Sequence, residues 1–175
     1  MIEPSGRLHV GTTNSPIGVL TVVASDRGVR AVLWPGDADE GGHGRVPVDG
    51  DLSGESHPIV ERAIGQLTEY LAGERHEFDV PLDPEGTPFQ HEAWRILREI
   101  PYGETISYGE QARRLGDVRK ARAVGSANGR NPISIIVPCH RVVGATGALT
   151  GFAGGLDVKA WLLRHERAAS EPSLF

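Results

Sequence analysis

The stretch from Ser107 to Asn128 reads SYGEQARRLGDVRKARAVGSAN and indicates two short helices joined by a tight turn. Ser107 stands three residues before Glu110, which is the spacing of a capping box at a helix start. Gly116 ends this first helix, because glycine readily takes the left-handed conformation that closes helices. A second helix runs from about Val118 to Asn128. The stretch therefore predicts a helix-turn-helix.

The chain on the C-terminal side of this motif contains a short apolar run and a final helix. After Asn131-Pro132, the segment Ile133 to Val137 predicts a strand that leads to Cys139. A glycine-rich stretch follows, and Leu156 to Ala168 predicts the last helix, with Asp157 suitably placed in its first turn.

The N-terminal side indicates a second, smaller domain. Thr87-Pro88-Phe89-Gln90 combines a capping box with proline at the first helical position, and it opens a helix that Pro101 is expected to end. We expect a domain boundary here, with an N-terminal α/β domain at residues 1–86 and a mainly helical domain at 87–175. The elements predicted in the first domain are a β-hairpin over Ile17–Ser25 and Val29–Trp34, a flexible loop at about 35–57, a helix over Pro58–Ala72 and a strand over Glu77–Leu82.

Length and composition are those of a globular protein. The 175 residues suffice for one compact domain or two small ones. No segment approaches the roughly 20 consecutive apolar residues of a membrane span. The start Met1-Ile2-Glu3-Pro4 lacks the features of a signal peptide. We therefore expect a cytoplasmic protein without a membrane partner.

The charge is distributed unevenly along the chain. The formal net charge of −5 by itself argues against nucleic-acid binding. However, residues 1–90 carry six arginines and fifteen acidic residues, or −9, whereas residues 91–175 carry twelve basic and eight acidic residues, or +4. The asymmetry indicates an acidic scaffold beside a basic working half, although chance also produces such differences.

Cys139 is the only cysteine, so it cannot form an internal disulfide or supply the paired thiolates of a structural zinc site. It is either a reactive thiol or a small buried residue. A free thiol has a pKa of about 8.5, so a nucleophilic cysteine needs a proton acceptor near neutral pH. The adjacent His140 is the candidate, acting through a water or a local turn, because neighbouring strand residues face opposite sides. Glu166 is a candidate to orient the imidazole.

The run Ile135-Ile136-Val137-Pro138-Cys139-His140-Arg141-Val142-Val143 resembles the active-site signature of the O6-alkylguanine-DNA alkyltransferases, also called methylated-DNA–protein-cysteine methyltransferases. The resemblance covers about residues 87 to 168 and implies a ribonuclease-H-like α/β domain with a short antiparallel sheet, followed by a winged helix-turn-helix-like domain. Further motifs in the family's order and spacing are Ile100-Pro101-Tyr102-Gly103-Glu104-Thr105, Ser107-Tyr108-Gly109, Ala121-Arg122-Ala123-Val124-Gly125, Asn128-Gly129-Arg130-Asn131-Pro132 and Gly154-Gly155.

The resemblance implies a role for each catalytic residue. Cys139 is the alkyl acceptor, His140 takes its proton through a bound water, and Glu166 holds His140 in the working tautomer. Asn131 braces the turn before the active-site strand, and Tyr108 meets the DNA backbone and the flipped guanine. Structural readings stay open: a surface charge for Glu166, a turn residue for Asn131 and a packed aromatic ring for Tyr108.

The resemblance also implies that the second helix of the helix-turn-helix binds double-stranded DNA through the minor groove. Arg122 enters the base stack and fills the space of the extruded nucleotide, because a thiolate cannot reach a base inside the duplex. Its small neighbours Ala121, Ala123 and Gly125 allow close approach to DNA, and its basic neighbours Arg119 and Lys120 suit contacts with phosphates. Both sets are also compatible with an ordinary packed or solvated helix. The local charge around Asp117 is +4, from Arg113, Arg114, Arg119, Lys120 and Arg122.

Four residues match positions that line the family's alkylguanine pocket: Ser134, Val142, Phe152 and Ala153. Phe152 replaces a frequent tyrosine and lacks its phenolic donor, and Ala153 offers only its backbone amide to the O6 atom. Paired cysteines, which hold zinc near the N terminus of some family members, are absent. We therefore expect no metal and no cofactor.

The implied function is DNA repair by a suicide reaction. Cys139 takes the methyl or alkyl group of O6-alkylguanine, and of O4-alkylthymine, after the base is flipped out. A thioether is a poor leaving group, so each molecule is expected to act once, as a monomer in solution, with cooperative binding on DNA left open. Two other classes of function remain: a lesion sensor like the alkyltransferase-like proteins, which lack the acceptor cysteine, and a small-molecule cysteine hydrolase, which the basic second half disfavours.

Overall fold

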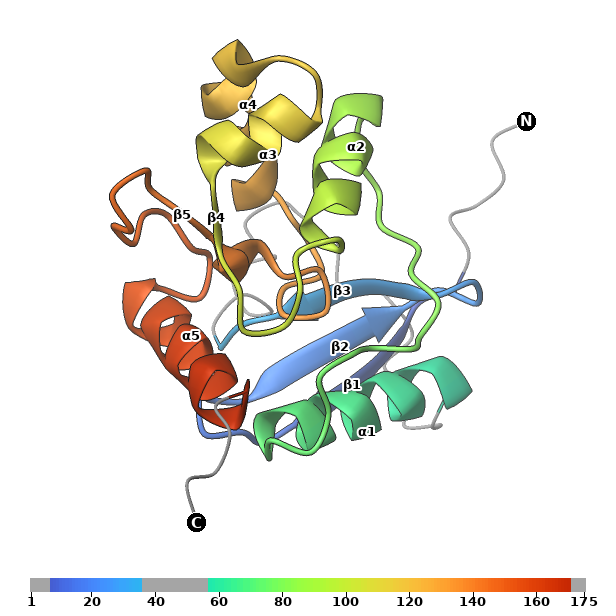
Figure 1. Ribbon diagram of the computed structural model, residues 1–175. Coiled ribbons are helices and arrows are strands. Elements are labelled where there is room, and N and C mark those ends of the chain that lie inside the picture. The colour runs from blue at the N-terminus through green and yellow to red at the C-terminus, as the bar shows by residue number, and fades with distance from the viewer. Residues whose placement is uncertain (1–6, 36–56, 171–175) are drawn as a thin grey trace, which may run out of the picture. The chain divides into compact units, whose positions relative to one another are not determined.

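Figure 1 shows the computed structural model, which describes residues 7–35 and 57–170. The chain divides into two compact units, residues 1–85 and 86–175. Apart from Pro35 and His57 at its ends, the loop predicted at 35–57 lies outside the described residues. Within the described ranges, no helix is both long enough and apolar enough to cross a membrane.

The first unit is a three-stranded antiparallel sheet with one helix. The strands β1 (His9–Thr13), β2 (Leu20–Ala24) and β3 (Val29–Leu33) lie in that order, and α1 (Pro58–Leu71) contacts all three. A Cβ added at Gly11 of β1 would lie 2.6 Å from Cγ1 of Val60 in α1, so the glycine lets the helix approach the strand closely. Val60, Ala63 and Leu67 of α1 are buried, as expected for an amphipathic helix on a sheet.

The predicted hairpin is present as β2 and β3. Val19 is 44% exposed, whereas Leu20 and Val22 are fully buried. The strand β1 was not predicted, because the sequence from His9 to Thr13 has no alternating apolar pattern. Its pairing with β2, in which Val10 faces Val23, forms the strand.

The predicted strand Glu77–Leu82 is wrong. The segment forms no regular strand and makes only an isolated parallel bridge between Leu82 and Val29. The amide of Val29 donates to the carbonyl of Pro81 at 2.8 Å, and a Cβ on Gly28 would lie 2.7 Å from the same oxygen. Glycine is therefore required at position 28, because the two backbones approach so closely there.

The second unit is built on three helices: α2 (Pro88–Leu97), α3 (Tyr108–Arg114) and α4 (Ala121–Gly129), with the 3-10 turn η2 (Val118–Lys120) between the last two. Buried polar bonds join them. Gln111 donates to the carbonyl of Ala93 and exchanges two amide hydrogen bonds with Asn128, and Trp94 Nε1 donates to the carbonyl of Ala127 at 2.9 Å. The predicted helix-turn-helix is thus α3 and α4, held against α2.

The capping predictions are confirmed in part. Thr87 and Gln90 form the reciprocal capping box of α2, although the helix ends at Leu97 rather than at Pro101. Ser107 caps α3 by accepting from the amide of Glu110 at 3.0 Å. The Glu110 carboxylate does not complete a second capping box, because it binds guanidinium groups of its own helix instead.

Four further elements complete the described part of the second unit. The strands β4 (Ile106–Ser107) and β5 (Val142–Val143) pair in parallel, with Ser107 facing Val143. The 3-10 turn η3 (Cys139–Arg141) precedes β5 directly, and the helix α5 (Leu156–Ser170) contacts η3. The short ladder therefore fixes the start of α3 close to the segment that carries Cys139.

Candidate active site

The segment that leads to Cys139 is a series of tight turns, so the predicted strand Ile133–Val137 is wrong. The amide of Ile136 donates to the carbonyl of Ser134 at 2.9 Å, across Ile135, whose φ is +74°. This is a γ-turn of the rare positive-φ form, which is strained for a β-branched residue. The run is apolar because every residue from 131 to 143 is buried, and a short apolar run does not by itself distinguish a strand from a buried turn.

Asn131 holds these turns in place. Its Nδ2 donates to the carbonyl of Val137 at 2.8 Å, and its Oδ1 accepts from the amide of Ile133 at 3.0 Å. Both bonds are buried, and Asn131 is 2% exposed. The side chain therefore closes the loop from residue 133 to 137 and supports the strained γ-turn between these two points.

Cys139 is the first residue of η3 and is 9% exposed. Its amide donates to the carbonyl of Val137 at 2.8 Å, across Pro138, whose φ of −83° and ψ of 66° form an inverse γ-turn. Cys139 and His140 thus share a 3-10 turn and not a strand. The rule that neighbouring strand residues face opposite sides does not apply to them.

His140 and Arg141 both bind Glu166, although 26 and 25 residues separate them from it. His140 Nε2 lies 2.7 Å from Glu166 Oε2, and Arg141 binds both carboxylate oxygens at 2.9 Å. Arg141 also donates to the carbonyl of Ile100 at 2.7 Å. Glu166 is 1% exposed, so the reading of a surface charge does not fit it. The sequence motif contains Arg141 but did not reveal that it shares this carboxylate.

The pKa shifts of this cluster define its protonation state. Burial opposes ionisation of Glu166, but hydrogen bonds from His140 and Arg141 outweigh it and hold the pKa of Glu166 far below its usual range. Burial lowers the pKa of His140 and outweighs the opposing effect of Glu166. A neutral imidazole thus faces a carboxylate, which only accepts hydrogen bonds, so the proton lies on Nε2.

The remaining nitrogen, Nδ1 of His140, carries the lone pair. It is buried and has no hydrogen-bond partner among the described residues. Cys139 Sγ therefore makes no direct hydrogen bond to it. This arrangement suits a base that takes a proton through one intervening water.

Lys159 is a residue of the site that the sequence did not reveal. It is fully buried on α5, and its ammonium donates to the carbonyl of Thr150 at 2.7 Å. Thr150 Oγ1 donates to the hydroxyl of Tyr108 at 3.0 Å, and Lys159 Nζ lies 5.9 Å from the centre of the Tyr108 ring. Burial lowers the pKa of Lys159, while the charge of Cys139 raises it. The available signal was its position three residues before Leu162, which is fully buried on the same helix.

The residues predicted to contact DNA lie on and before α4. Arg122 and Ala123 are exposed, and Arg122 has no ion-pair partner within the described ranges. Ala121 and Gly125 are half-buried, and a Cβ added at Gly125 would sit 3.8 Å from the Tyr108 ring, an ordinary contact.

The basic cluster is weaker than its sequence suggests. Glu110 binds Arg113 at 2.7 Å and Arg114 at 3.1 Å, and these bonds lower the pKa of Glu110 to about 2. Arg119 binds Asp117 at 3.0 Å. The local charge of +4 predicted from the sequence did not count Glu110, which lies one helical turn before Arg113 and Arg114.

The four predicted pocket residues fall into two groups. Ser134 and Val142 are buried in the segment on either side of Cys139. Phe152 is half-buried and Ala153 is exposed, in the stretch before α5.

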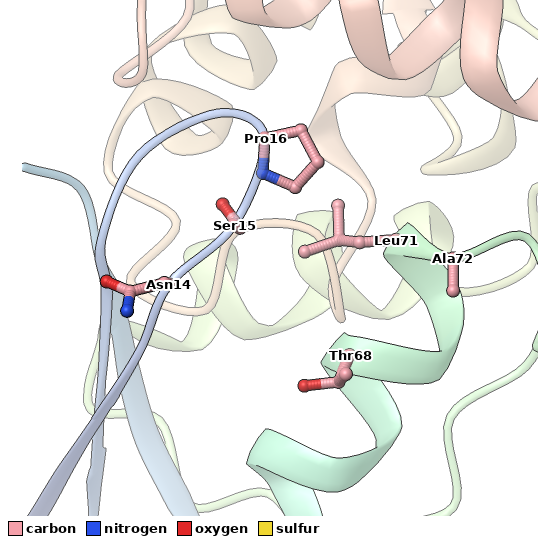
Figure 2. Close-up of a pocket in the computed structure, with 6 residues that line it drawn as sticks. All are labelled: Asn14, Ser15, Pro16, Thr68, Leu71 and Ala72. Atoms are coloured by element: carbon pink, nitrogen blue, oxygen red, sulfur yellow. The ribbon is translucent and has the colours of Figure 1, made fainter.

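A separate open pocket of about 230 Å³ lies in the first unit, between the turn at residues 14–16 and the end of α1 (Figure 2). Its lining contains no titratable side chain, so it offers no acid, base or thiol. The lining residues are Asn14, Ser15, Pro16, Thr68, Leu71 and Ala72.

The second unit thus combines a nearly buried cysteine, a neutral histidine and a helix-turn-helix, which define a thiol-dependent protein of DNA-binding fold. Family models agree with this class. The model described as 6-O-methylguanine DNA methyltransferase, ribonuclease-like domain, matches residues 8–84, and the model described as the DNA binding domain of the same enzyme matches residues 88–168. The chain belongs to the 6-O-methylguanine DNA methyltransferase family, and its predicted two-domain fold is confirmed.

Individual relatives match over nearly their whole length. A methylated-DNA–protein-cysteine methyltransferase of Methanosarcina acetivorans is 48% identical over 159 residues, 91% of this chain and 98% of the relative. One of Mycobacterium tuberculosis is 46% identical over 171 residues, 96% of this chain and 99% of the relative.

Solved structures of this family have the same fold. The crystal structure of the Mycobacterium tuberculosis O6-methylguanine methyltransferase matches with a TM-score of 0.81 at 44% identity, covering 95% of this chain and 97% of that one. A structure of the Mycobacterium tuberculosis protein in complex with DNA matches with a TM-score of 0.82 at 43% identity, covering 92% and 94%.

Proposed function

We propose that the protein repairs DNA by transferring the methyl or alkyl group of O6-alkylguanine to Cys139, once per molecule. The observation that carries the proposal is the His140–Glu166 pair beside the cysteine. Glu166 fixes the proton of His140 on Nε2, which leaves Nδ1 as a buried base on the residue that follows Cys139. Family membership and the DNA-bound relative support DNA as the partner.

The reaction begins with ionisation of the thiol. Cys139 gives its proton through a water to His140 Nδ1, and Glu166 stabilises the imidazolium that forms. The buried ammonium of Lys159 adds a positive charge that favours the thiolate, as the mutual effect on its pKa indicates. The thiolate is the attacking species, because a neutral thiol is a weak nucleophile.

Transfer follows as a displacement at the alkyl carbon. The sulfur forms a bond to this carbon while the bond from carbon to O6 breaks, and guanine leaves with the electron pair. The leaving guanine takes up one proton from the His140 imidazolium, which restores the neutral imidazole. The product is a thioether on Cys139, and no second nucleophile is present in the described cluster to remove it, so the protein acts once.

DNA binding is assigned to α4 and its preceding turn. The substrate carbon is inaccessible inside a duplex, so the base must leave the stack, and an inserted side chain offsets part of the unstacking cost of a few kcal/mol. Arg122 suits this role because it is exposed and not neutralised within the described ranges. We assign minor-groove binding to a monomer, with Tyr108 near the flipped base and Phe152 and Ala153 at the pocket rim. O4-alkylthymine is the second substrate of the proposal.

The lesion-sensing alternative is not favoured. Such proteins lack the acceptor cysteine, whereas this chain has Cys139 together with its base and its orienting carboxylate. The experiment that tests the proposal is intact-mass analysis after incubation with duplex DNA containing O6-methylguanine. Wild type is expected to gain one methyl group, and Cys139→Ser none. Lesion binding without a mass change, or more than one methyl group removed per molecule, contradicts the proposal.

A further inference from the structure

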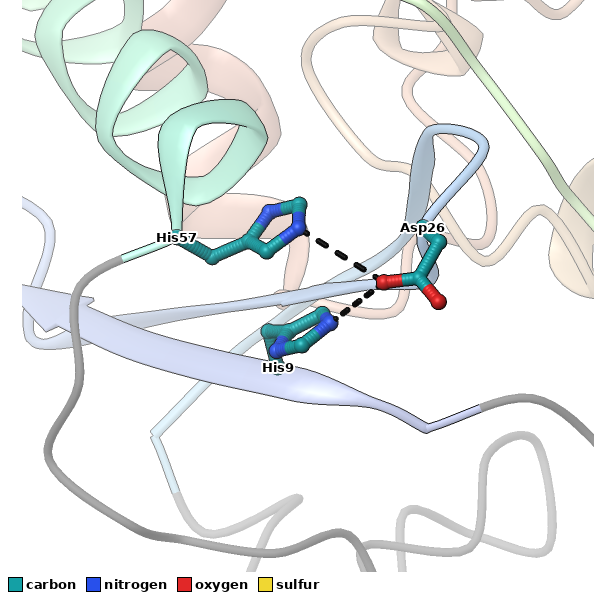
Figure 3. Close-up of side chains that lie close together, drawn as sticks. All are labelled: His9, Asp26 and His57. Carbon is teal, nitrogen blue, oxygen red and sulfur yellow. Dashed lines mark hydrogen bonds and ion pairs between the residues drawn. The ribbon is translucent and has the colours of Figure 1, made fainter.

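Three side chains with metal-binding atoms converge in the first unit (Figure 3). His9 comes from the start of β1, Asp26 from the turn between β2 and β3, and His57 from the position directly before α1. His9 Nε2 lies 2.8 Å from Asp26 Oδ1, and His57 Nε2 lies 3.7 Å from the same oxygen. All three atoms lie within 4.8 Å of one another.

The donor set and its spacing fit a transition-metal ion. Two imidazoles and one carboxylate are ligands that zinc uses when it keeps a fourth position for water. With metal–ligand bonds of about 2.0–2.2 Å, two ligands of a tetrahedral ion lie about 3.3–3.6 Å apart. The observed separations from Asp26 Oδ1, 2.8 and 3.7 Å, lie on either side of this range.

We propose that His9, Asp26 and His57 form a binding site for a divalent transition-metal ion of the zinc class, completed by solvent. The site contains no cysteine. The ion ties β1, the β2–β3 turn and the start of α1 together, and so stabilises the first unit. The proposal does not depend on alkyl transfer.

Binding requires two local changes. The imidazole rings stack with centroids 3.8 Å apart and planes 15° apart, so they must turn until their in-plane lone pairs converge on the ion. Asp26 is exposed, and the histidine side chains keep 18% and 20% of their surface in solvent, which leaves room for this rotation. His57 Nδ1 accepts from the amide of Ile59 at 3.3 Å. Metal binding at Nε2 places the proton on Nδ1, so the ion replaces this long capping bond.

The charges around the cluster support a cation in part. The Asp26 carboxylate supplies the negative charge of the ligand set. Arg7 carries a positive charge near Asp26, which opposes a cation. The ion therefore depends on all three ligands together rather than on Asp26 alone.

The test is a titration of the full-length, chelator-treated protein with Co²⁺, followed by displacement with Zn²⁺. We expect saturation at one equivalent, visible bands of a four- or five-coordinate site, and a rise in the unfolding temperature with Zn²⁺. A sulfur-to-cobalt charge-transfer band would show binding at Cys139 and would overturn the proposal, as would the absence of saturable binding.

Matched variants locate the ion. His57→Asn removes the imidazole but keeps a preferred N-cap residue, so the metal-free protein should retain its stability. His57→Asn and His9→Ala are expected to weaken binding by more than the roughly 10–100-fold that loss of an outer-shell partner costs. Asp26→Asn tests the carboxylate without altering either ring. His76→Asn, at an exposed histidine outside the cluster, is the control. Equal affinity in the wild type, His57→Asn and His9→Ala would refute the site.

Discussion

Replacement of Glu166 by glutamine tests both the stability and the reactivity of the candidate active site. Glutamine keeps the volume of the side chain, so no cavity forms, but it removes the charge that Arg141 binds through two bonds at 2.9 Å. Arg141 is 6% exposed and would be left as a buried cation without a counter-charge. Breaking such a pair costs about 3–5 kcal/mol. The variant is therefore expected to lose about this much of its free energy of unfolding.

The same change should reverse the tautomer of His140. If the amide oxygen of the new glutamine accepts from Arg141, its NH₂ group faces His140 Nε2 and donates to it. The imidazole proton then moves to Nδ1, which no longer acts as a base toward Cys139. Loss of a general base lowers a rate by about 10²–10⁴-fold. We expect a reduction of this size in the single-turnover rate of methyl transfer near neutral pH.

The assay combines urea denaturation with single-turnover methyl transfer measured across pH. The rate of the variant should approach that of the wild type as the pH nears the ordinary thiol pKa of about 8.5, because hydroxide then replaces the base. The control is Glu99→Gln, which removes an exposed ion pair with Arg95 worth about 1 kcal/mol or less. A Glu166→Gln variant with a wild-type rate at neutral pH refutes the role of Glu166. A deficit that is equal at every pH shows a purely structural role instead.

Three further predictions concern Ile135, Arg122 and the loss of stability in acid. Ile135→Gly and Ile135→Ala both remove the buried side chain, but only glycine adopts a φ of +74° without strain. Denaturation should therefore show that Ile135→Gly is more stable than Ile135→Ala by about 1–2 kcal/mol. Arg122→Ala should change the free energy of unfolding by no more than about 0.5 kcal/mol, but it should slow repair of duplex DNA. The control is Arg113→Ala, at an arginine that is paired with Glu110, and it should change the repair rate little. Equal effects of the two variants on the repair rate would contradict a place for Arg122 in the DNA interface. Because burial lowers the pKa of His140, the unfolded chain takes up this proton more readily than the folded protein, and stability should fall as the pH drops below 6.5. Glu166, whose pKa is lowered in the folded protein, should add a further loss below 4.5, and urea midpoints that stay constant across the acidic range contradict both assignments.

The sequence predicted best where neighbouring residues decide the structure. Thr87 and Gln90 are three positions apart, so their capping box depends only on local geometry, and the structure confirms it. The apolar run at Ile133–Val137 was misread, because its burial is a property of the whole unit. The turns there are fixed by Asn131, whose two bonds reach Ile133 and Val137.

The candidate site divides in the same way. Cys139 and His140 could be identified from the sequence, since they are adjacent and the motif around them resembles that of a known family. The expectation of no metal considered cysteines alone, and the pairing of His9 with His57 was not visible because 48 positions separate them. Lys159 was not identified either, because a lysine in a helix is usually solvated and only the packing of α5 shows that it is buried.

By itself, the sequence determined most helix starts, the family and the candidate thiol and base, because each depends on residues close together in the chain. The tertiary structure alone decided which groups surround the candidate site. It brings Glu166 to His140 across 26 positions. Hydrogen bonds from His140 and Arg141 keep the buried carboxylate ionised, whereas burial keeps the imidazole neutral. The physical reason is that pKa values and tautomers depend on burial and on partners in space, which local patterns do not encode.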